Sequence, residues 1–269
     1  MQGSFHNIAS IVLAAGKGTR MKSNIPKVLH SIAGKPILQW VVNALKSISI
    51  NPICVVIGGD IKYFDEFISQ NKDLVFCEQI MQKGTGDAVA SAAFGFENIS
   101  IPHYAKGKLL YGKKIHSEYV VICTGDTPNL SSDTLWQLCA HCIENKFSLG
   151  LIVMEHPNPY GYGRVLLDKN NNIVRIIEQK DLDESLSDIH LCNSGVIFAK
   201  TSIIFNLLNH ITPNNVQNEY YLTDVFDIAY TQGINSYPLI TKNHTQFDGV
   251  NTVEQLKALE KKMLHAINN

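Results

Sequence analysis

The sequence contains no apolar run that approaches the roughly 20 residues needed for a transmembrane helix. Residues 1–10 lack the positively charged segment that opens a secretory signal. Only 17% of the residues are charged and the net charge is −1, so there is no general basic field for nucleic acid and no acidic tail. Because 45% of the residues are hydrophobic, general disorder is excluded. We expect a soluble cytoplasmic protein without nucleic-acid or membrane partners, in which any anion site is local.

The sequence also gives little indication that its cysteines bind metal or perform redox chemistry. Most of the cysteines fall in apolar, strand-like segments, which favours reduced core residues in Cys54, Cys77, Cys123, Cys139, Cys142 and Cys192. The spacing of Cys139 and Cys142 is that of a C-x-x-C pair, which can bind zinc or perform redox chemistry. No second C-x-x-C and no nearby histidine pair accompanies it, and residues 133–144 have a helical pattern, so packing is the favoured interpretation.

A basic loop with two glycines follows the first predicted strand, residues 8–13. Glycines allow backbone N–H groups to approach a ligand, and converging amides bind anions. The spacing excludes two common phosphate loops: Gly16-Lys17-Gly18 does not complete a Walker A motif, and the Gly16-x-Gly18-x-x pattern ends on Met21 instead of glycine or alanine. The residues expected to form this phosphate site are Leu13, Ala14, Ala15, Gly16, Lys17, Gly18, Arg20 and Lys27.

The segment LAAGKGTRM, residues 13–21, followed by Pro26-Lys27, resembles the signature of the sugar-nucleotide pyrophosphorylases. It looks most like the uridyltransferase domain of the bifunctional enzymes that make UDP-N-acetylglucosamine, a peptidoglycan and cell-wall precursor. The resemblance implies an α/β, Rossmann-like nucleotide-diphospho-sugar transferase fold, with a mainly parallel mixed sheet, helices on both faces and a small sugar-binding β lobe. It also implies that Lys17 and Arg20 hold the β- and γ-phosphates of UTP, and that Lys27 neutralises the α-phosphate or the sugar phosphate.

A segment rich in amides and glycine, residues 79–86, precedes a helix predicted at 87–94. Glutamine amides can pair with the donor and acceptor edge of a pyrimidine, and a helix N-terminus favours anions. Taken alone, the segment is equally well explained as an ordinary N-cap loop. By the resemblance it is the uracil-binding segment, and its binding residues are Gln79, Gln82, Gly84 and Thr85.

An aspartate follows the apolar strand predicted at 119–123, in the order Thr124-Gly125-Asp126. Open α/β sheets place ligands at the carboxyl ends of their strands, so Asp126 is the expected metal ligand. The resemblance implies that Asn251 is the second protein ligand of Mg²⁺ and that Thr124 and Gly125 line the substrate site. Thr124 departs from the family pattern, in which tyrosine usually precedes Gly-Asp, and this change removes an aromatic wall.

Beyond residue 150, short apolar strands alternate with polar turns, and residues 165–167 and 173–177 are predicted to form a hairpin. The resemblance implies that Gly161, Glu178 and Asn193 line the sugar site. A glutamate there can accept hydrogen bonds from sugar hydroxyls, and an asparagine can both donate and accept. We therefore expect an amino-sugar phosphate as the acceptor.

Alternating strand and helix patterns imply βαβ units within a single nucleotidyltransferase domain, residues 1–269. Its expected parts are a nucleotide-binding half at 1–150, a sugar-binding half at 151–252 and a C-terminal helix at 253–269. The lysine-containing stretch 97–118 lacks a period, and it is expected to be a solvated insertion, with a mobile basic lid as the alternative. No hexapeptide repeat is present, so we expect no acetyltransferase activity and a monomer or weak oligomer.

Two further helices are less sharply bounded. One is expected to open at Gly58-Gly59 and to bury Tyr63, Phe64, Phe67 and Ile68. Residues 217–224 are expected to form the first part of the other, which continues to about residue 230. Its Glu219 and Tyr220 either close the sugar side or serve as aromatic packing.

These features predict uridyl transfer from UTP to N-acetylglucosamine 1-phosphate, with Mg²⁺ as cofactor. Two alternatives remain. Another nucleotidyltransferase of the same fold, using glucose 1-phosphate, CTP or a molybdopterin-type acceptor, would share the phosphate loop and Asp126. A non-catalytic nucleotide-binding regulatory protein is the second alternative, motivated by Thr124 and by the missing acetyltransferase half.

Overall fold

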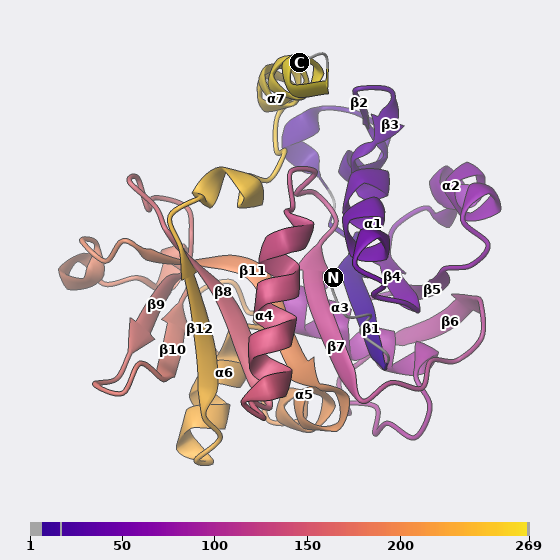
Figure 1. The fold of residues 1–269 in the computed structure, drawn as a ribbon. Helices are drawn as coiled ribbons and strands as arrows, with labels where there is room; N and C mark the ends of the chain where they lie inside the picture. The colour runs from indigo at the N-terminus through magenta and orange to yellow at the C-terminus, as the bar shows by residue number, and fades with distance from the viewer. Residues whose placement is uncertain (1–6, 17, 268–269) are drawn as a thin grey trace.

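One sheet of ten strands runs through the part of the chain that the computed structural model describes, residues 7–16 and 18–267 (Figure 1). Its main path is β10-β9-β11-β7-β1-β4-β5-β6, and β8 connects β11 to β12. The strands are β1 (Ile8–Leu13), β4 (Ile53–Ile57), β5 (Val75–Gln79), β6 (Gly107–Tyr111), β7 (Tyr119–Thr124), β8 (Leu149–Glu155), β9 (Arg164–Leu167), β10 (Ile173–Ile177), β11 (Leu191–Lys200) and β12 (Ser236–Thr241). A separate hairpin pairs β2 (Ser31–Ile32) with β3 (Lys35–Pro36).

The central strands β7, β1, β4 and β5 run parallel. They are buried on both faces, which is why their sequences are nearly unbroken apolar runs. Leu13 at the end of β1 is level with Val56 in β4 and with Thr124 in β7. The loops that follow these strands therefore leave the sheet along one edge, where their residues can meet.

Helices cover both faces of this sheet (Figure 1). One face packs against α1 (Ile37–Ser47), α2 (Asp65–Gln70) and α4 (Ser132–Glu144), and the other against α3 (Thr85–Ala92), α5 (Thr201–Leu208) and α6 (Asp224–Thr231). The alternation within β1 explains the two layers, because Ile8 and Val12 belong to the first core and Ala9 and Ile11 to the second. In the described ranges, no helix combines the length and the hydrophobicity of a membrane span.

The last helix, α7 (Val253–Ile267), packs beside the β2–β3 hairpin and the start of α1 (Figure 1). Leu256 and Leu259 cover a small apolar cluster that includes Ile32 and Val250. The backbone N–H of Ala33 donates to the carboxylate of Glu260 at 2.9 Å. These contacts fix the segment just ahead of α7 against the β2–β3 hairpin and the start of α1.

β11 connects the central parallel strands to the strands that follow later in the chain, because it pairs antiparallel with β7 on one side and with β8 and β9 as well. Its register against β8 shifts between Asn193 and Ile197, and Gly195 within this irregularity has a φ of +79°. That left-handed conformation favours glycine. A Cβ built on Gly195 would lie 3.4 Å from the methyl carbon of Thr124, so the irregular part of β11 faces the carboxyl end of β7.

The predicted fold class is confirmed, and so is the packing role of the cysteines. All of the cysteines are buried free thiols. Burial raises the pKa of the Cys142 thiol to about 12, and it also raises the pKa of Cys139. Thiols that remain protonated are poor metal ligands and nucleophiles, which agrees with packing as the role of the C-x-x-C pair.

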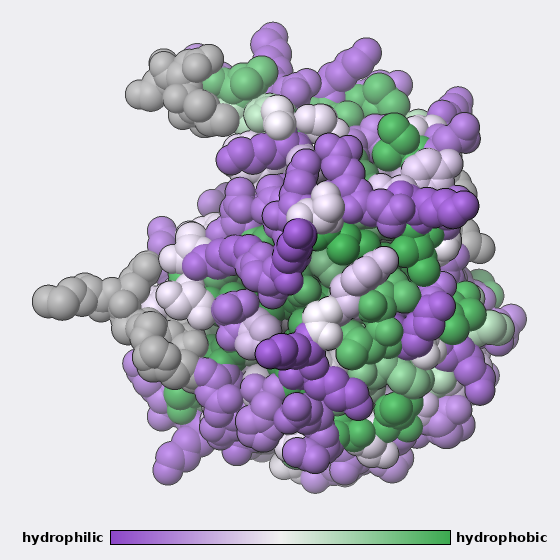
Figure 2. All heavy atoms as spheres, turned by 90° about the vertical axis from the view of Figure 1, so that its right-hand side faces the viewer, coloured by the Kyte–Doolittle hydropathy of each residue, from purple (hydrophilic) through white to green (hydrophobic). Residues whose placement is uncertain are grey.

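The prediction for residues 97–118 is wrong in part. This stretch supplies β6, which pairs antiparallel with β5 and so forms the edge of the sheet, and it buries Ala105 and Ile115. Figure 2 shows the side of the molecule on which α2, β5 and β6 lie, where hydrophobic side chains reach the surface among hydrophilic ones. Tyr111 of β6 is among the exposed hydrophobic residues. The stretch is therefore a structural part of the sheet.

Two helix predictions also need correction. The helix expected within 217–224 begins only at Asp224, because the preceding loop bonds to another segment: the N–H of Tyr220 donates to the carbonyl of Lys83 at 2.8 Å, and the N–H of Gly86 donates to the carbonyl of Tyr220 at 2.7 Å. Tyr63 is 45% exposed, while Phe64 is buried. It lies in a 3₁₀ helix, Ile61–Phe64, whose tighter winding changes the face on which Tyr63 lies.

Candidate active site

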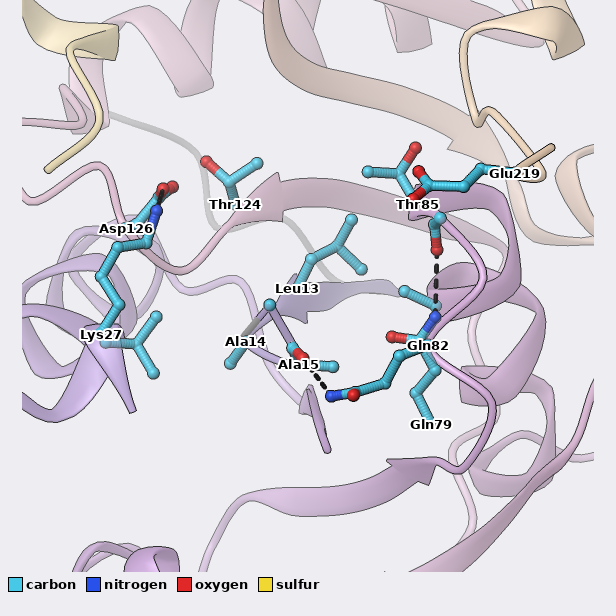
Figure 3. Close-up of a pocket in the computed structure, with 14 residues that line it drawn as sticks. Leu13, Ala14, Ala15, Lys27, Gln79, Gln82, Thr85, Thr124, Asp126 and Glu219 are labelled. Carbon is cyan, nitrogen blue, oxygen red and sulfur yellow. Dashed lines mark hydrogen bonds and ion pairs between the residues drawn. The ribbon is translucent and has the colours of Figure 1, made fainter. Parts of the chain in front are cut away.

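A cavity of about 420 Å³ lies where the loops after β1, β5 and β7 meet (Figure 3). Most of the residues predicted to bind the nucleotide line it. The lining is Leu13, Ala14, Ala15, Gly16, Lys27, Val28, Gln79, Gln82, Gly84, Thr85, Ala88, Thr124, Asp126 and Glu219. We call this the nucleotide-side cavity. Lys17, a predicted phosphate ligand, lies outside the described residues.

The loop after β1 is anchored at two points. The N–H of Ala14 donates to the carbonyl of Val56 at 2.8 Å, and the side-chain amide of Gln82 donates to the carbonyl of Ala15 at 2.6 Å (Figure 3). Gly18 has a φ of +58°, and a Cβ there would lie only 2.8 Å from the Cβ of Lys27. Glycine at this position is therefore what lets the loop close tightly against Lys27.

Three segments that are far apart in the sequence bring their charged and amide groups to one point. The ammonium of Lys27 forms an ion pair with the carboxylate of Asp126, and it donates to Oδ1 of Asn251 at 2.9 Å. The guanidinium of Arg20 donates to the same Asn251 oxygen at 2.9 Å. The N–H of Val250 donates to the backbone carbonyl of Asp126 at 3.0 Å, which holds the two segments together. Arg20 and Lys27, predicted to bind phosphate, thus form one cluster with the predicted metal ligands Asp126 and Asn251.

This cluster has a donor set that fits Mg²⁺. The carboxylate of Asp126 and the amide oxygen of Asn251 both contact the ammonium of Lys27, so two oxygen donors face the same position. Mg²⁺ takes one or two protein oxygens beside phosphate oxygens and water. Asp126 and Asn251 could hold the ion together with the phosphates of a substrate.

The predicted base-reading loop is built differently from the expectation. The amide nitrogen of Gln79 donates to the carboxylate of Asp87 at 2.8 Å and to the carbonyl of Gly84 at 3.0 Å, and the side chain is only 4% exposed. The amide nitrogen of Gln82 is taken up by Ala15. Both glutamines therefore line the cavity while their N–H groups fix the loop. Asp87, which the sequence interpretation did not single out, holds Gln79 in place.

Glycine at position 84 allows the loop after β5 to lie close to the segment that carries Glu219 and Tyr220. Gly84 has a φ of +99°, and a Cβ there would lie 2.6 Å from the carbonyl oxygen of Tyr220 and 2.9 Å from Cβ of Glu219. Tyr220 stacks on Tyr104 with ring centroids 3.9 Å apart. Glu219 lines the nucleotide-side cavity, and of the two interpretations given for this pair, aromatic packing is the one that describes Tyr220.

A second cavity of about 580 Å³, the sugar-side cavity, adjoins the first. Leu13, Thr85, Thr124 and Asp126 line both. The other lining residues are Arg20, Thr127, Tyr160, Gly161, Tyr162, Gly163, Glu178, Asn193, Ser194, Gly195, Ile197, Leu222, Thr223, Phe247, Gly249, Asn251 and Gln255. The predicted sugar residues Gly161, Glu178 and Asn193 are thus brought together, and Thr124 stands at the junction of the two cavities.

The polar groups of the sugar-side cavity are held in place by their neighbours. Burial raises the pKa of Glu178, although the hydroxyl of Thr223 donates to its carboxylate at 3.0 Å and opposes the shift. The side-chain oxygen of Asn193 accepts from the N–H of Gly195 at 2.8 Å. The N–H of Gly161 donates to the side-chain oxygen of Gln179 at 2.8 Å. Thr223 was not singled out from the sequence, because residues 217–224 were expected only to begin a helix.

A third, acidic cavity of about 210 Å³ shares Glu178 with the sugar-side cavity. It is lined by Asp181, Asp224 and Asp227, with Arg175 as the opposing cation. Burial and then the charges of Glu178, Asp227 and Asp181 raise the pKa of Asp224 to about 6, and Arg175 acts against this shift. Ionisation of Asp224 is therefore less favourable in the folded protein than in the unfolded chain.

The Asp224→Asn variant is expected to raise Tm near neutral pH. Because the pKa of Asp224 is higher in the folded protein than in the unfolded chain, the native state binds more protons between about pH 4 and 6, and its stability falls as the pH rises through this window. The variant removes this loss, so the two Tm values should converge near pH 4. Thermal unfolding across pH tests this, with exposed Asp188→Asn as the control. A difference in Tm that does not change with pH would contradict it.

The chain matches the family model described as MobA-like NTP transferase domain over residues 10–186. It is 33% identical over 262 residues to Bifunctional protein GlmU of Pelobacter propionicus. The aligned region covers 97% of this chain and 53% of that protein. It is 34% identical over 255 residues to Bifunctional protein GlmU of Alcanivorax borkumensis, and this aligned region covers 95% of this chain and 52% of that protein. The chain spans about half the length of the curated relatives that it matches.

Solved structures share the fold at lower sequence identity. An inositol-1-phosphate CTP transferase from T. maritima superimposes with a TM-score of 0.67 at 17% identity, covering 98% of this chain and 96% of that one. A UDP-glucose pyrophosphorylase complexed with UDP-glucose gives a TM-score of 0.71 at 17% identity, covering 97% and 100%. With its fold, its two adjoining cavities and the match over residues 10–186, this chain belongs to the family of MobA-like NTP transferase domains.

Proposed function

We propose that this chain transfers the uridylyl group of UTP to N-acetylglucosamine 1-phosphate, giving UDP-N-acetylglucosamine and pyrophosphate. One observation carries the proposal: Lys27, Asp126 and Asn251 meet beside the junction of a nucleotide-side and a sugar-side cavity. The relatives named Bifunctional protein GlmU support the choice of substrates, as does the resemblance of the phosphate loop to the uridyltransferase domain of bifunctional enzymes.

The chemistry asks little covalent work of the protein. An oxygen of the sugar phosphate attacks the α-phosphorus of UTP in line, the new P–O bond forms, and the bond to the leaving pyrophosphate breaks. No general base is needed, since a phosphate monoester is already ionised at pH 7. The task of the protein is to bring two polyanions together and to stabilise the charge around the reacting phosphorus.

The cluster at the junction suits this task. Arg20 and Lys27 neutralise phosphate oxygens, and the backbone after β1 offers N–H groups at the end of a buried strand. Asp126 and Asn251 would hold Mg²⁺ beside Lys27. When bound there, Mg²⁺ supplies positive charge to the phosphate oxygens of both substrates. Lys27 contacts both proposed metal ligands, so it keeps their oxygens aimed at the position where the phosphates meet.

Sugar recognition falls to the opposite wall of the sugar-side cavity. Glu178 accepts hydrogen bonds from sugar hydroxyls, and the hydroxyl of Thr223 fixes one of its carboxylate oxygens. Asn193 is placed by the register shift in β11, and its side chain can reach a hydroxyl or an acetamido group. Thr124 places a small side chain at the junction, where the family pattern given by the resemblance has tyrosine.

A substrate grid tests the proposed function. Pyrophosphate release is measured with Mg²⁺ for UTP, CTP, ATP, GTP and dTTP, each combined with N-acetylglucosamine 1-phosphate, glucose 1-phosphate and inositol 1-phosphate. We expect the highest kcat/KM for UTP with N-acetylglucosamine 1-phosphate. A clear preference for another pair would replace the substrates and keep the reaction class. Absence of release across the whole grid would favour the regulatory alternative.

The Glu178→Gln variant is expected to raise KM for the sugar phosphate by about 10- to 100-fold, because a hydrogen bond to a charged acceptor contributes about 1.5–3 kcal/mol. KM for the nucleotide should change little, because Glu178 does not line the nucleotide-side cavity. Since the pKa of Glu178 is raised, the wild-type KM for the sugar should also increase as the pH falls, and the variant should lose this dependence. Steady-state kinetics with exposed Glu184→Gln as control would contradict the role if both variants behaved alike.

A further inference from the structure

A cluster of nitrogen and oxygen donors lies outside the proposed Mg²⁺ position. His156 follows β8, His244 begins the 3₁₀ helix His244–Phe247, and Asp248 directly follows that helix. Each offers one ligand atom, and these atoms all lie within 4.8 Å of one another. The two imidazole rings have centroids 4.2 Å apart and are tilted by 56°. Three metal-ligating side chains from two separate segments therefore converge.

The hydrogen bonds of the cluster leave it short of partners. Nδ1 of His156 accepts from the N–H of Asn158 at 3.1 Å, which leaves Nε2 as its remaining ligand atom. Nδ1 of His244 is buried and has no hydrogen-bond partner among the described residues. An unpartnered buried polar atom is costly, and a neighbouring metal ion is one of the groups that can satisfy it. The half-buried setting of all three side chains also limits competition from water.

The donor set selects the kind of ion. Two imidazole nitrogens and one carboxylate oxygen suit Zn²⁺ and similar transition-metal ions, whereas Mg²⁺ and Ca²⁺ prefer oxygen ligands only. We propose that His156, His244 and Asp248 bind one divalent transition-metal ion of the Zn²⁺ type. Three protein ligands leave a fourth position for water or another small ligand. This site is separate from the oxygen donors Asp126 and Asn251.

The position of the cluster gives the ion a structural consequence. Asp248 directly precedes Gly249, and a Cβ built on Gly249 would lie 3.2 Å from the carboxylate of Asp126. Val250 bonds to the backbone of Asp126, and Asn251 accepts from Arg20 and Lys27. A metal ion held by Asp248 and His156 would tie the end of β8 to the segment that carries Asn251. The ion would thereby stabilise the position of that segment.

Binding to the purified chain tests the proposal without an activity assay. Equilibrium dialysis against Zn²⁺ is performed in excess Mg²⁺, so that the oxygen donors near Asp126 do not compete. We expect one Zn²⁺ per chain, a Co²⁺ absorption band in the visible range when Co²⁺ replaces it, and a rise in Tm of about 5 °C at Zn²⁺ concentrations near 100 times Kd.

Variants locate the ion. His156→Gln, His244→Gln and Asp248→Asn should each weaken Zn²⁺ binding by at least about tenfold, since loss of even an outer-shell partner costs 10- to 100-fold. His116→Gln removes an exposed histidine far along the chain and should leave binding unchanged. Asp248→Asn keeps the shape of the side chain, so it serves if a histidine variant does not fold, as judged by circular dichroism. No stoichiometric binding, or equal binding by the wild type and the three ligand variants, would overturn the proposal.

Discussion

Replacing Lys27 by alanine is expected to lower kcat by at least about 10²- to 10³-fold, the loss typical of removing one preorganised donor to transition-state charge. The ammonium of Lys27 is the cation that contacts both Asp126 and Asn251, and it lies beside the junction of the two cavities. Without it, the phosphates of the two substrates would lose one of the positive charges that offset their repulsion. Pyrophosphate release at saturating concentrations of the most active substrate pair measures the loss.

The same variant should remain folded. The side chains of Lys27 and Asp126 are 14% and 20% exposed, so water can solvate the remaining carboxylate. Circular dichroism and thermal unfolding should therefore stay close to the wild type, and Lys62→Ala, on the exposed face of a 3₁₀ helix, is the matched control. A folded Lys27→Ala protein with near-normal kcat would contradict the assignment of Lys27 to the reacting phosphates.

Much of the fold was predictable because its central strands are buried on both faces. Residues 53–57 form an uninterrupted apolar segment, and all of them lie in the buried strand β4. The same reasoning placed β1 and the hairpin of β9 and β10. Such segments can be recognised from their local sequence, since a polar side chain on either face of the strand would be buried away from water.

The edge strands β6 and β12 were not predicted, because their sequences do not carry such a local signal. β12 contains Pro238, which argues against a strand in sequence, yet it is tolerated where a strand pairs on only one side, with β8. β6 has the sequence GKLLY, which has no clear alternation, and it is a strand because β5 offers it an edge. These segments are determined by tertiary pairing, which propensity cannot report.

The candidate site shows the same division. Asp126 and Lys27 could be singled out from local motifs, and the sheet brings their loops together. The roles of the amide groups could not be predicted, because a glutamine in sequence does not reveal whether it faces a base or a backbone carbonyl. Gln82 bonds to Ala15 in the loop after β1, and Gln79 bonds to Asp87 in α3, so both pairings depend on how the chain packs in three dimensions.

The Asp126→Asn variant is expected to lower kcat by about 10²-fold or more and to raise the Mg²⁺ concentration needed for half-maximal activity. Asparagine keeps the size of the side chain, so the close approach of Gly249, whose Cβ position is 3.2 Å from the carboxylate, is preserved. What is lost is the negative charge that would hold the ion beside Lys27. Initial rates measured across a Mg²⁺ titration separate the two effects, with exposed Asp188→Asn as the control.

The double variant sharpens this test. Lys27 and Asp126 are in direct contact, so their effects should not add. Lys27→Ala combined with Asp126→Asn is expected to have a kcat close to that of the more damaged single variant, because both changes disable the same charge cluster. If the losses instead multiply, the two side chains act at independent points of the reaction. If Asp126→Asn leaves both kcat and the Mg²⁺ titration unchanged, Asp126 is no ligand of the catalytic ion.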